Sequence, residues 1–211
     1  YRRCLARPRC RRFAALLAAK REVSEDVDTA ARTVVDDVRK RGDAALIEAT
    51  RKFDRQELTP ATLAVSAAEI DAAERSVAPK QRDALLVARD RIEAFHARQM
   101  PADDRYTDAI GVELGIRWTP IDAVGLYVPG GTAAYPSSVL MNAVPARVAG
   151  VGRIVMVTPT PDGRTNPLVL AAARIAGIDE VYRIGGAQAI AALAYGTETI
   201  KPVNKIIGPG N

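Results

Sequence analysis

The first hundred residues carry apolar side chains at the spacing of amphipathic helices. Between residues 27 and 38, alanine and valine recur at steps of three and four, which places them on one helical face. Ser24 precedes this run as a suitable N-cap, and Gly42 follows it as a helix stop. A second helix is expected over residues 43–53. The pattern therefore predicts two consecutive helices that meet at Gly42.

Two further helices are predicted by their start signals. Ser66 and Glu69 have the three-residue spacing of a capping box, in which each side chain binds the backbone N–H of the other residue. Pro79 suits the first position of a fourth helix, because that position needs no N–H donor. We expect residues 13–99 to form helices without strands, within a helical region that spans residues 13–105.

The pattern changes at residue 112 to short apolar or alternating stretches, which are typical of strands. Strands are predicted at residues 112–118, 123–128, 153–158, 180–186 and 203–208. Helices are predicted at residues 136–149, from Pro167 to Gly177 with Asn166 as the N-cap, and at residues 187–195, with stops at Gly150, Gly177 and Gly196. Strands that alternate with helices pair in parallel through right-handed crossovers. The sequence therefore predicts an α/β fold, with a helical amino-terminal region before a Rossmann-like parallel sheet and its flanking helices in residues 106–211.

The charge of the chain is concentrated at its start. Lys and Arg number 30 and Asp and Glu number 25, which gives a formal net charge of +5, but residues 1–12 contain six of the arginines and no acid. The remainder is close to neutral, so the excess belongs to a basic arm, expected to be disordered, and no nucleic-acid partner is expected. A non-enzymatic nucleotide- or RNA-binding module that uses this arm remains an alternative.

Composition also bears on the cellular compartment of the protein and on the roles open to its cysteines and its histidine. No run of about 18 apolar residues occurs, so no membrane partner is expected and the protein is placed in the cytoplasm. Cys4 and Cys10 lie in the basic arm, at a spacing typical of neither a redox pair nor a disulfide framework. The single histidine, His96, is interpreted as a surface or capping residue of a helix. One histidine cannot build a multi-histidine metal site.

Three glycine-containing loops follow predicted strands, where open parallel sheets bind their ligands. They are YVPGGTAAYPSS at residues 127–138, GGAQ at 185–188 and GPGN at 208–211. Glycine lets the backbone approach a ligand closely, and a helix N-terminus offers unpaired N–H groups to a pyrophosphate. These loops favour a nucleotide, although each glycine could instead serve a tight turn. None has the G-x-G-x-x-G spacing, so the usual dinucleotide fingerprint is absent.

Longer stretches around these loops resemble the histidinol dehydrogenase family. The resemblance is carried by VGLYVPGGTAAYPSSVLMNAVPARVAGV at residues 124–151, GGAQAIAALAYGTETI at 185–200 and KIIGPGN at 205–211, with RGDAALIEATRKFD at 41–54 and RIEAFHARQ at 91–99. It implies an aldehyde-dehydrogenase-like nucleotide-binding layer in a zinc-dependent homodimer. It also implies oxidation of L-histidinol through L-histidinaldehyde to L-histidine, with two NAD consumed, at the end of histidine biosynthesis.

The same resemblance implies roles for individual residues. In the family, NAD is contacted by the Tyr of YVPGG, the Gln of GGAQ and the Asn of GPGN, which are Tyr127, Gln188 and Asn211 in this chain. All three follow predicted strands, so we expect them to meet at one edge of the sheet. Alternatively, Gln188 caps its own helix and Tyr127 is buried where its strand ends. Lys205 and Arg147 could bind phosphate by charge, but ordinary surface positions are favoured for both.

No catalytic or metal-binding residue is assigned in this chain. By the resemblance, the zinc ligands, the substrate-binding groups and the acid/base pair come from sequence after GPGN. We therefore expect the sheet domain to be incomplete at its C-terminus and the chain alone to be inactive. Another NAD-dependent aldehyde or acyl-phosphate reductase is the enzymatic alternative. That chemistry normally needs a nucleophilic cysteine, and neither Cys4 nor Cys10 is placed for it.

Overall fold

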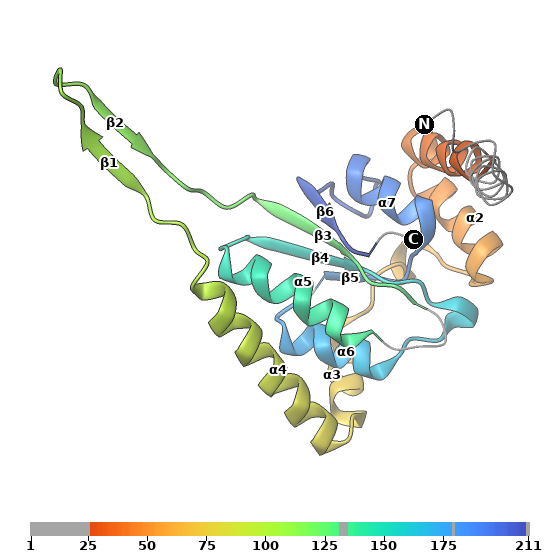
Figure 1. The fold of residues 1–211 in the computed structure, drawn as a ribbon. Coiled ribbons are helices and arrows are strands. Elements are labelled where there is room, and N and C mark those ends of the chain that lie inside the picture. Colours follow the sequence, from red (N-terminus) through yellow and green to blue (C-terminus); the bar gives the residue numbers. More distant parts are fainter. Residues whose placement is uncertain (1–25, 131–134, 179, 210–211) are drawn as a thin grey trace, which may run out of the picture.

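A parallel four-stranded sheet forms the centre of the computed structural model, which describes residues 26–130, 135–178 and 180–209 (Figure 1). Its strands are β3 (Ala123–Tyr127), β4 (Arg153–Val157), β5 (Glu180–Tyr182) and β6 (Lys205–Ile207). They are arranged in the order β5-β4-β3-β6, and every neighbouring pair is parallel. The predicted α/β fold is confirmed.

Three helices connect the strands and begin where the sequence predicts them. They are α5 (Pro136–Val148), α6 (Pro167–Ile175) and α7 (Gly186–Tyr195). The Leu168 N–H donates to the Asn166 side chain over 2.9 Å, so Asn166 caps α6. Gly150, Gly177 and Gly196 follow the three helices with positive φ angles, a conformation that glycine adopts without strain. The predicted helix stops are therefore confirmed.

Alternating side chains of each strand pack into two separate cores, one on each face of the sheet. In β4, Ile154 and Met156 contribute to the core beneath α5 and α6, whereas Val155 and Val157 contribute to the core beneath α7. This is the alternation that a strand buried on both faces requires. The sheet is thus the middle layer of three (Figure 1).

The amino-terminal helices complete both outer layers. Residues 26–41 are helical, and α2 (Asp43–Asp54), α3 (Ala67–Ser76) and α4 (Pro79–Ala97) follow, with a short 3-10 helix, Pro60–Thr62, between α2 and α3. Helix α2 packs on α7, whereas α3 packs on α6 and α4 packs on α5. The helical region and the sheet therefore share their cores, and α2 lies on the opposite side of the sheet from α3 and α4.

The predicted helix starts are confirmed. Ser66 and Glu69 form the capping box, because the Glu69 N–H donates to Ser66 Oγ and the Ser66 N–H donates to Glu69 Oε2. Pro79 is the first residue of α4. No strand forms between residues 26 and 99, although Ala64 makes an isolated antiparallel bridge to Tyr182 at the edge of β5.

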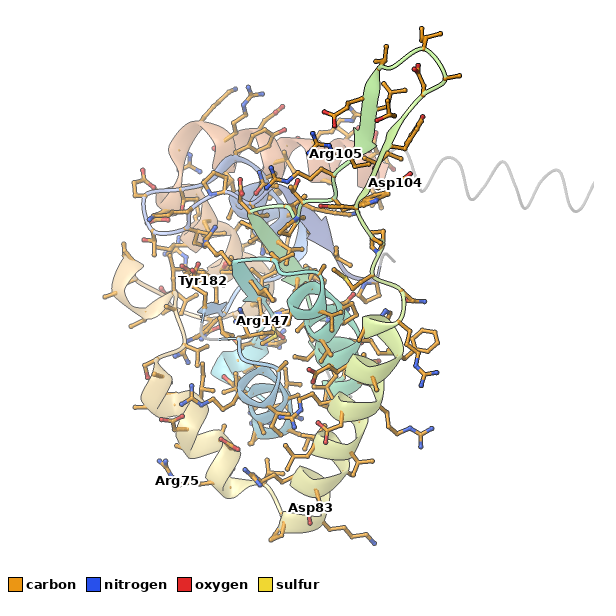
Figure 2. The ribbon with its side chains drawn as sticks, turned by 90° about the vertical axis from the view of Figure 1, so that its left-hand side faces the viewer. Arg75, Asp83, Asp104, Arg105, Arg147 and Tyr182 are labelled. Atoms are coloured by element: carbon orange, nitrogen blue, oxygen red, sulfur yellow. The ribbon has the colours of Figure 1, made fainter. Side chains whose placement is uncertain are left out.

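The expected strand at residues 112–118 exists in part, but the expectation that it joins the parallel sheet is wrong. Instead, β2 (Glu113–Ile116) pairs antiparallel with β1 (Asp104–Thr107) in a hairpin that projects from the body (Figures 1 and 2). The Asp108 carboxylate makes the turn, since it accepts the N–H groups of Ile110 and Val112 over 2.9 Å each. A short turn of this kind joins antiparallel neighbours.

Some of the features considered in the sequence lie outside the described residues. They are the basic arm of residues 1–12 with Cys4 and Cys10, the N-cap candidate Ser24, and Asn211. Among the helices that the structure does describe, none combines the length and apolar character needed to cross a membrane.

Candidate functional site

The loop after β3 and the start of α7 meet at the carboxyl edge of the sheet. Tyr127 is the last residue of β3, and its hydroxyl accepts a hydrogen bond of 3.1 Å from the N–H of Gly186, the first residue of α7. The bond joins residues that are 59 positions apart. Two of the three glycine loops singled out in the sequence are therefore in direct contact.

The glycines in these loops allow backbones to approach more closely than a side chain would permit. A Cβ atom placed on Gly208 would lie 2.5 Å from the Tyr127 carbonyl oxygen, and one placed on Gly185 would lie 2.4 Å from Pro159 Cβ. Pro159 belongs to the loop after β4, so the loops that follow all four strands converge at this edge. The glycines serve close packing between loops, which a tight-turn role alone would not require.

Gln188 is nearly fully buried, with 2% of its surface exposed, in the first turn of α7. It does not cap this helix, because the cap position is Gly185 and no side chain makes a capping bond there. The described residues provide no hydrogen bond to the Gln188 amide. The amide lines a cavity of about 310 Å³, hereafter the α2–α7 cavity, together with Phe53, Asp54 and Gly186.

Asp54, the last residue of α2, brings a carboxylate to the same cavity. Its Oδ2 atom is buried and has no hydrogen-bond partner in the described part of the chain. Burial raises the pKa of Asp54 above its ordinary value, and the positive charge of Arg55 opposes this rise. Sequence reasoning missed Asp54. An available signal was an acidic residue at a helix C-terminus, where the helix dipole disfavours negative charge.

A second cavity, of about 370 Å³, lies between the loops that follow β3 and β4. Its lining includes Pro129, Gly130, Pro159 and Thr160. Arg55, which follows α2, forms an ion pair with Asp162 in the loop after β4, with Nε and Nη2 of Arg55 2.8 and 3.0 Å from the two carboxylate oxygens. Arg55 follows Asp54 directly, so the end of α2 borders both cavities.

The two cations considered as phosphate partners lie elsewhere. Lys205 begins β6 and pairs in register with Val124, near the amino end of β3. Arg147 lies in the last turn of α5 and donates a hydrogen bond to the Gly177 carbonyl (Figure 2). Both positions are at the amino edge of the sheet, opposite the glycine loops. His96 is half-buried near the end of α4, and its Nδ1 lies 2.6 Å from Gln99 Oε1, as expected of a surface or capping residue.

The described residues contain no group of three or more His, Cys, Asp or Glu side chains that could hold a metal ion. They do contain groups suited to a nucleotide. A carboxylate only accepts hydrogen bonds, a glutamine amide donates and accepts them, and a tyrosine hydroxyl does both. The arrangement at the carboxyl edge can therefore bind a polar ligand with several donors and acceptors, in a setting typical of open α/β sheets.

The chain is similar to known proteins over most of its length. A family model described as histidinol dehydrogenase matches residues 17–211. The chain is 68% identical over 200 residues to a histidinol dehydrogenase of Brucella abortus (strain 2308), with 95% of this chain and 46% of that protein covered. It is 69% identical over 200 residues to one of Nitrobacter winogradskyi, with 95% and 47% covered.

The fold is also similar to that of a solved structure. The crystal structure of histidinol dehydrogenase from Elizabethkingia anophelis matches with a TM-score of 0.84 and 40% identity, and the match covers 88% of this chain and 42% of that one. The chain spans about half the length of the curated relatives it matches. Because the family model matches nearly the whole of this chain, the chain belongs to the histidinol dehydrogenase family.

Proposed function

We propose that this chain is the NAD-binding portion of a histidinol dehydrogenase that oxidises L-histidinol through L-histidinaldehyde to L-histidine with two NAD. One observation carries the proposal. Tyr127 and the Gly186–Gln188 turn, which come from two of the family's motifs, meet at the carboxyl edge of the sheet, and Gly208 packs against Tyr127. Open parallel sheets bind nucleotides at this edge.

Each residue has a chemical task in this proposal. The Tyr127 hydroxyl accepts the Gly186 N–H with a lone pair, which leaves its proton for donation to the dinucleotide. The Gln188 amide donates and accepts hydrogen bonds from a buried position, where such bonds are strong because water is excluded. Asn211, which follows β6, joins them by the family's motif. Bound NAD supplies the acceptor for the hydride that leaves the substrate.

Zinc enters the proposal only because the chain belongs to the histidinol dehydrogenase family. The described residues do not offer a metal site, so no chemical step is assigned to the ion here. We propose that the ligands of one zinc per subunit, the substrate-binding groups and the acid/base residues come from sequence after Asn211. The 211-residue chain alone is then expected to bind NAD and to form no NADH from histidinol, even with zinc supplied.

We also propose that the full enzyme is a cytoplasmic homodimer. Support comes from the β1–β2 hairpin, in which every strand residue is exposed. Tyr106, Leu114 and Ile116 expose 52%, 43% and 57% of their surfaces, and Trp118, just after β2, exposes 58%. Exposed apolar side chains gathered on one projecting element are typical of an interaction surface. Sedimentation of the full enzyme tests the dimer, which a single monomeric species would contradict.

Replacing Gln188 by Ala tests the NAD site directly. If the amide makes a buried hydrogen bond to the nucleotide, its loss weakens NAD binding by roughly 1 to 3 kcal/mol. The measurement is a ligand-observed NMR titration of NAD against the wild-type chain and the variant. Gln81→Ala, at an exposed position in α4, is the matched control. Equal NAD affinity in the wild type and Gln188→Ala, or no binding by the wild type, would contradict the proposal.

A further inference from the structure

Asp54 occupies a position that is unfavourable for a carboxylate in two ways, through its place at a helix end and through burial. It ends α2, where the helix dipole repels negative charge. Its Oδ2 atom is buried and has no hydrogen-bond partner among the described residues. Its pKa is raised because burial disfavours the charged form. A buried polar atom that lacks a partner in a native fold needs an explanation, and a ligand that supplies the partner is one.

The cations next to Asp54 in sequence are engaged elsewhere. Arg55 adopts a left-handed backbone conformation, with φ of 53°, and its guanidinium forms the bidentate ion pair with Asp162. The Lys52 ammonium lies 5.3 Å from the centre of the Phe53 ring. Neither side chain donates a hydrogen bond to the Asp54 carboxylate in the described structure. The carboxylate is therefore left with an unused acceptor beside the α2–α7 cavity.

The composition of this cavity defines the chemistry of its occupant. One wall is apolar and consists of side chains from the helix at residues 26–41, namely Val27, Ala30, Ala31 and Val34. The polar groups of its lining are the carboxylate of Asp54 and the amide of Gln188. An apolar wall beside a carboxylate acceptor and an amide suits a ring or sugar that carries N–H or O–H donors.

We propose that Asp54 binds the dinucleotide by accepting a hydrogen bond from one of its N–H or O–H donors, a ribose hydroxyl or an amino or carboxamide group. The inference rests on the proposed NAD-binding function and adds to it a residue from α2. The helical amino-terminal region then contributes directly to the nucleotide site, besides covering the sheet. The cost of burying the Oδ2 atom of this half-buried residue is offset when the ligand donates a hydrogen bond to it.

The test compares Asp54→Ala and Asp54→Asn with the wild-type chain. NAD, ADP-ribose and nicotinamide mononucleotide are titrated by ligand-observed NMR, and thermal unfolding is followed without ligand. Asp54→Ala is expected to bind NAD at least about tenfold more weakly, because a charged acceptor is lost, and Asp54→Asn to lose less, because its amide oxygen still accepts. Both ligand-free variants should unfold at the same or a higher temperature than the wild type.

A control variant and the two smaller ligands, ADP-ribose and nicotinamide mononucleotide, distinguish the possible outcomes. Asp83→Ala, at an exposed position near the start of α4 and far from the sheet edge, should change neither binding nor stability (Figure 2). A loss seen with ADP-ribose alone assigns the donor to the adenosine half, and a loss seen with nicotinamide mononucleotide alone assigns it to the carboxamide. A loss seen with both assigns it to the ribose that the two ligands share. Unchanged NAD binding by Asp54→Ala, or a lowered unfolding temperature, overturns the inference alone. A wild-type chain that binds no NAD overturns the proposed function as well.

Discussion

Single glycines determine how closely the loops at the carboxyl edge of the sheet can pack. Gly185 lies directly against Pro159, so a methyl group at this position would meet the proline ring at 2.4 Å. Such a distance is far inside van der Waals contact, and neither the ring nor the backbone can yield cheaply. The fit of the loops after β4 and β5 therefore depends on the absence of one side chain.

Gly185→Ala is accordingly expected to destabilise the chain by about 1 to 3 kcal/mol through overpacking. Urea denaturation followed by circular dichroism measures the change. Gly152→Ala is the matched control, because a Cβ atom there would find its nearest neighbour at an ordinary 3.7 Å. If both variants unfold at the same urea concentration, the close approach at Gly185 is not the constraint described here.

Some residues of the candidate site could be predicted from the sequence, and others could not. Tyr127 and Gln188 could be predicted because they stand in glycine-rich loops after strands and match a family motif. For Asp54 the sequence offers only an acidic residue at a helix C-terminus, because its importance depends on burial and on the absence of a partner, which are properties of the folded chain. The bond between Tyr127 and Gly186 likewise depends on the order of the strands.

The link between α3 and β5 shows how a whole element is held in place. Glu69 accepts hydrogen bonds from the Ser66 N–H and from Nη2 of Arg183, which follows β5. Backbone bonds beside it join Val65 to Val181 and Arg183 to Leu63 over 2.8 and 3.0 Å. These contacts cover the outer edge of β5, which would otherwise remain open for pairing.

The Arg183 and Ser66 contacts lower the pKa of Glu69 from 4.5 to about 2. A lowered pKa in the folded state means that the ionised carboxylate stabilises the fold above pH 4.5 and that this contribution is lost as the pH falls toward 2. Glu69→Gln should therefore lower the free energy of unfolding by about 1 kcal/mol at pH 7, a value reduced for the half-exposed side chain.

Urea titrations of the wild type and Glu69→Gln at several pH values check this prediction. The difference in unfolding free energy should shrink between pH 4.5 and pH 2, whereas the exposed Glu57→Gln control should show little difference at any pH. A difference between wild type and Glu69→Gln that stays constant with pH would mean that the carboxylate charge contributes nothing.

Element types could be predicted more fully than element partners. Caps and glycine stops predict the helices because they are local signals, as at Asn166 and Gly177. The alternation of Val112, Leu114, Ile116 and Trp118 predicts a strand equally well, but it does not say which strand pairs with it. The structure pairs β2 with β1, whose four exposed residues carry little apolar signal of their own.

For the molecule as a whole, the sheet, the helices that connect its strands and the amino-terminal helices form one layered unit. Helix α2 packs on α7 and places Asp54 beside Gln188, while α3 and α4 cover the other face. The hairpin departs from the amino edge, away from the glycine loops (Figure 1). The carboxyl edge of the sheet and the exposed β1–β2 hairpin thus occupy separate parts of the molecule, which allows the proposed ligand binding and the proposed assembly to be tested independently.

The central claim is that NAD binds at the carboxyl edge of the sheet. Backbone amide chemical shifts of the labelled chain, recorded as NAD is added, test it most directly because they locate the ligand without a mutation. The account predicts that the largest changes cluster at residues 53–55 and 185–188, at the amides on either side of Pro129, and at Gly208. Changes concentrated on the β1–β2 hairpin or at the amino edge of the sheet, or no change at high NAD concentration, would contradict it.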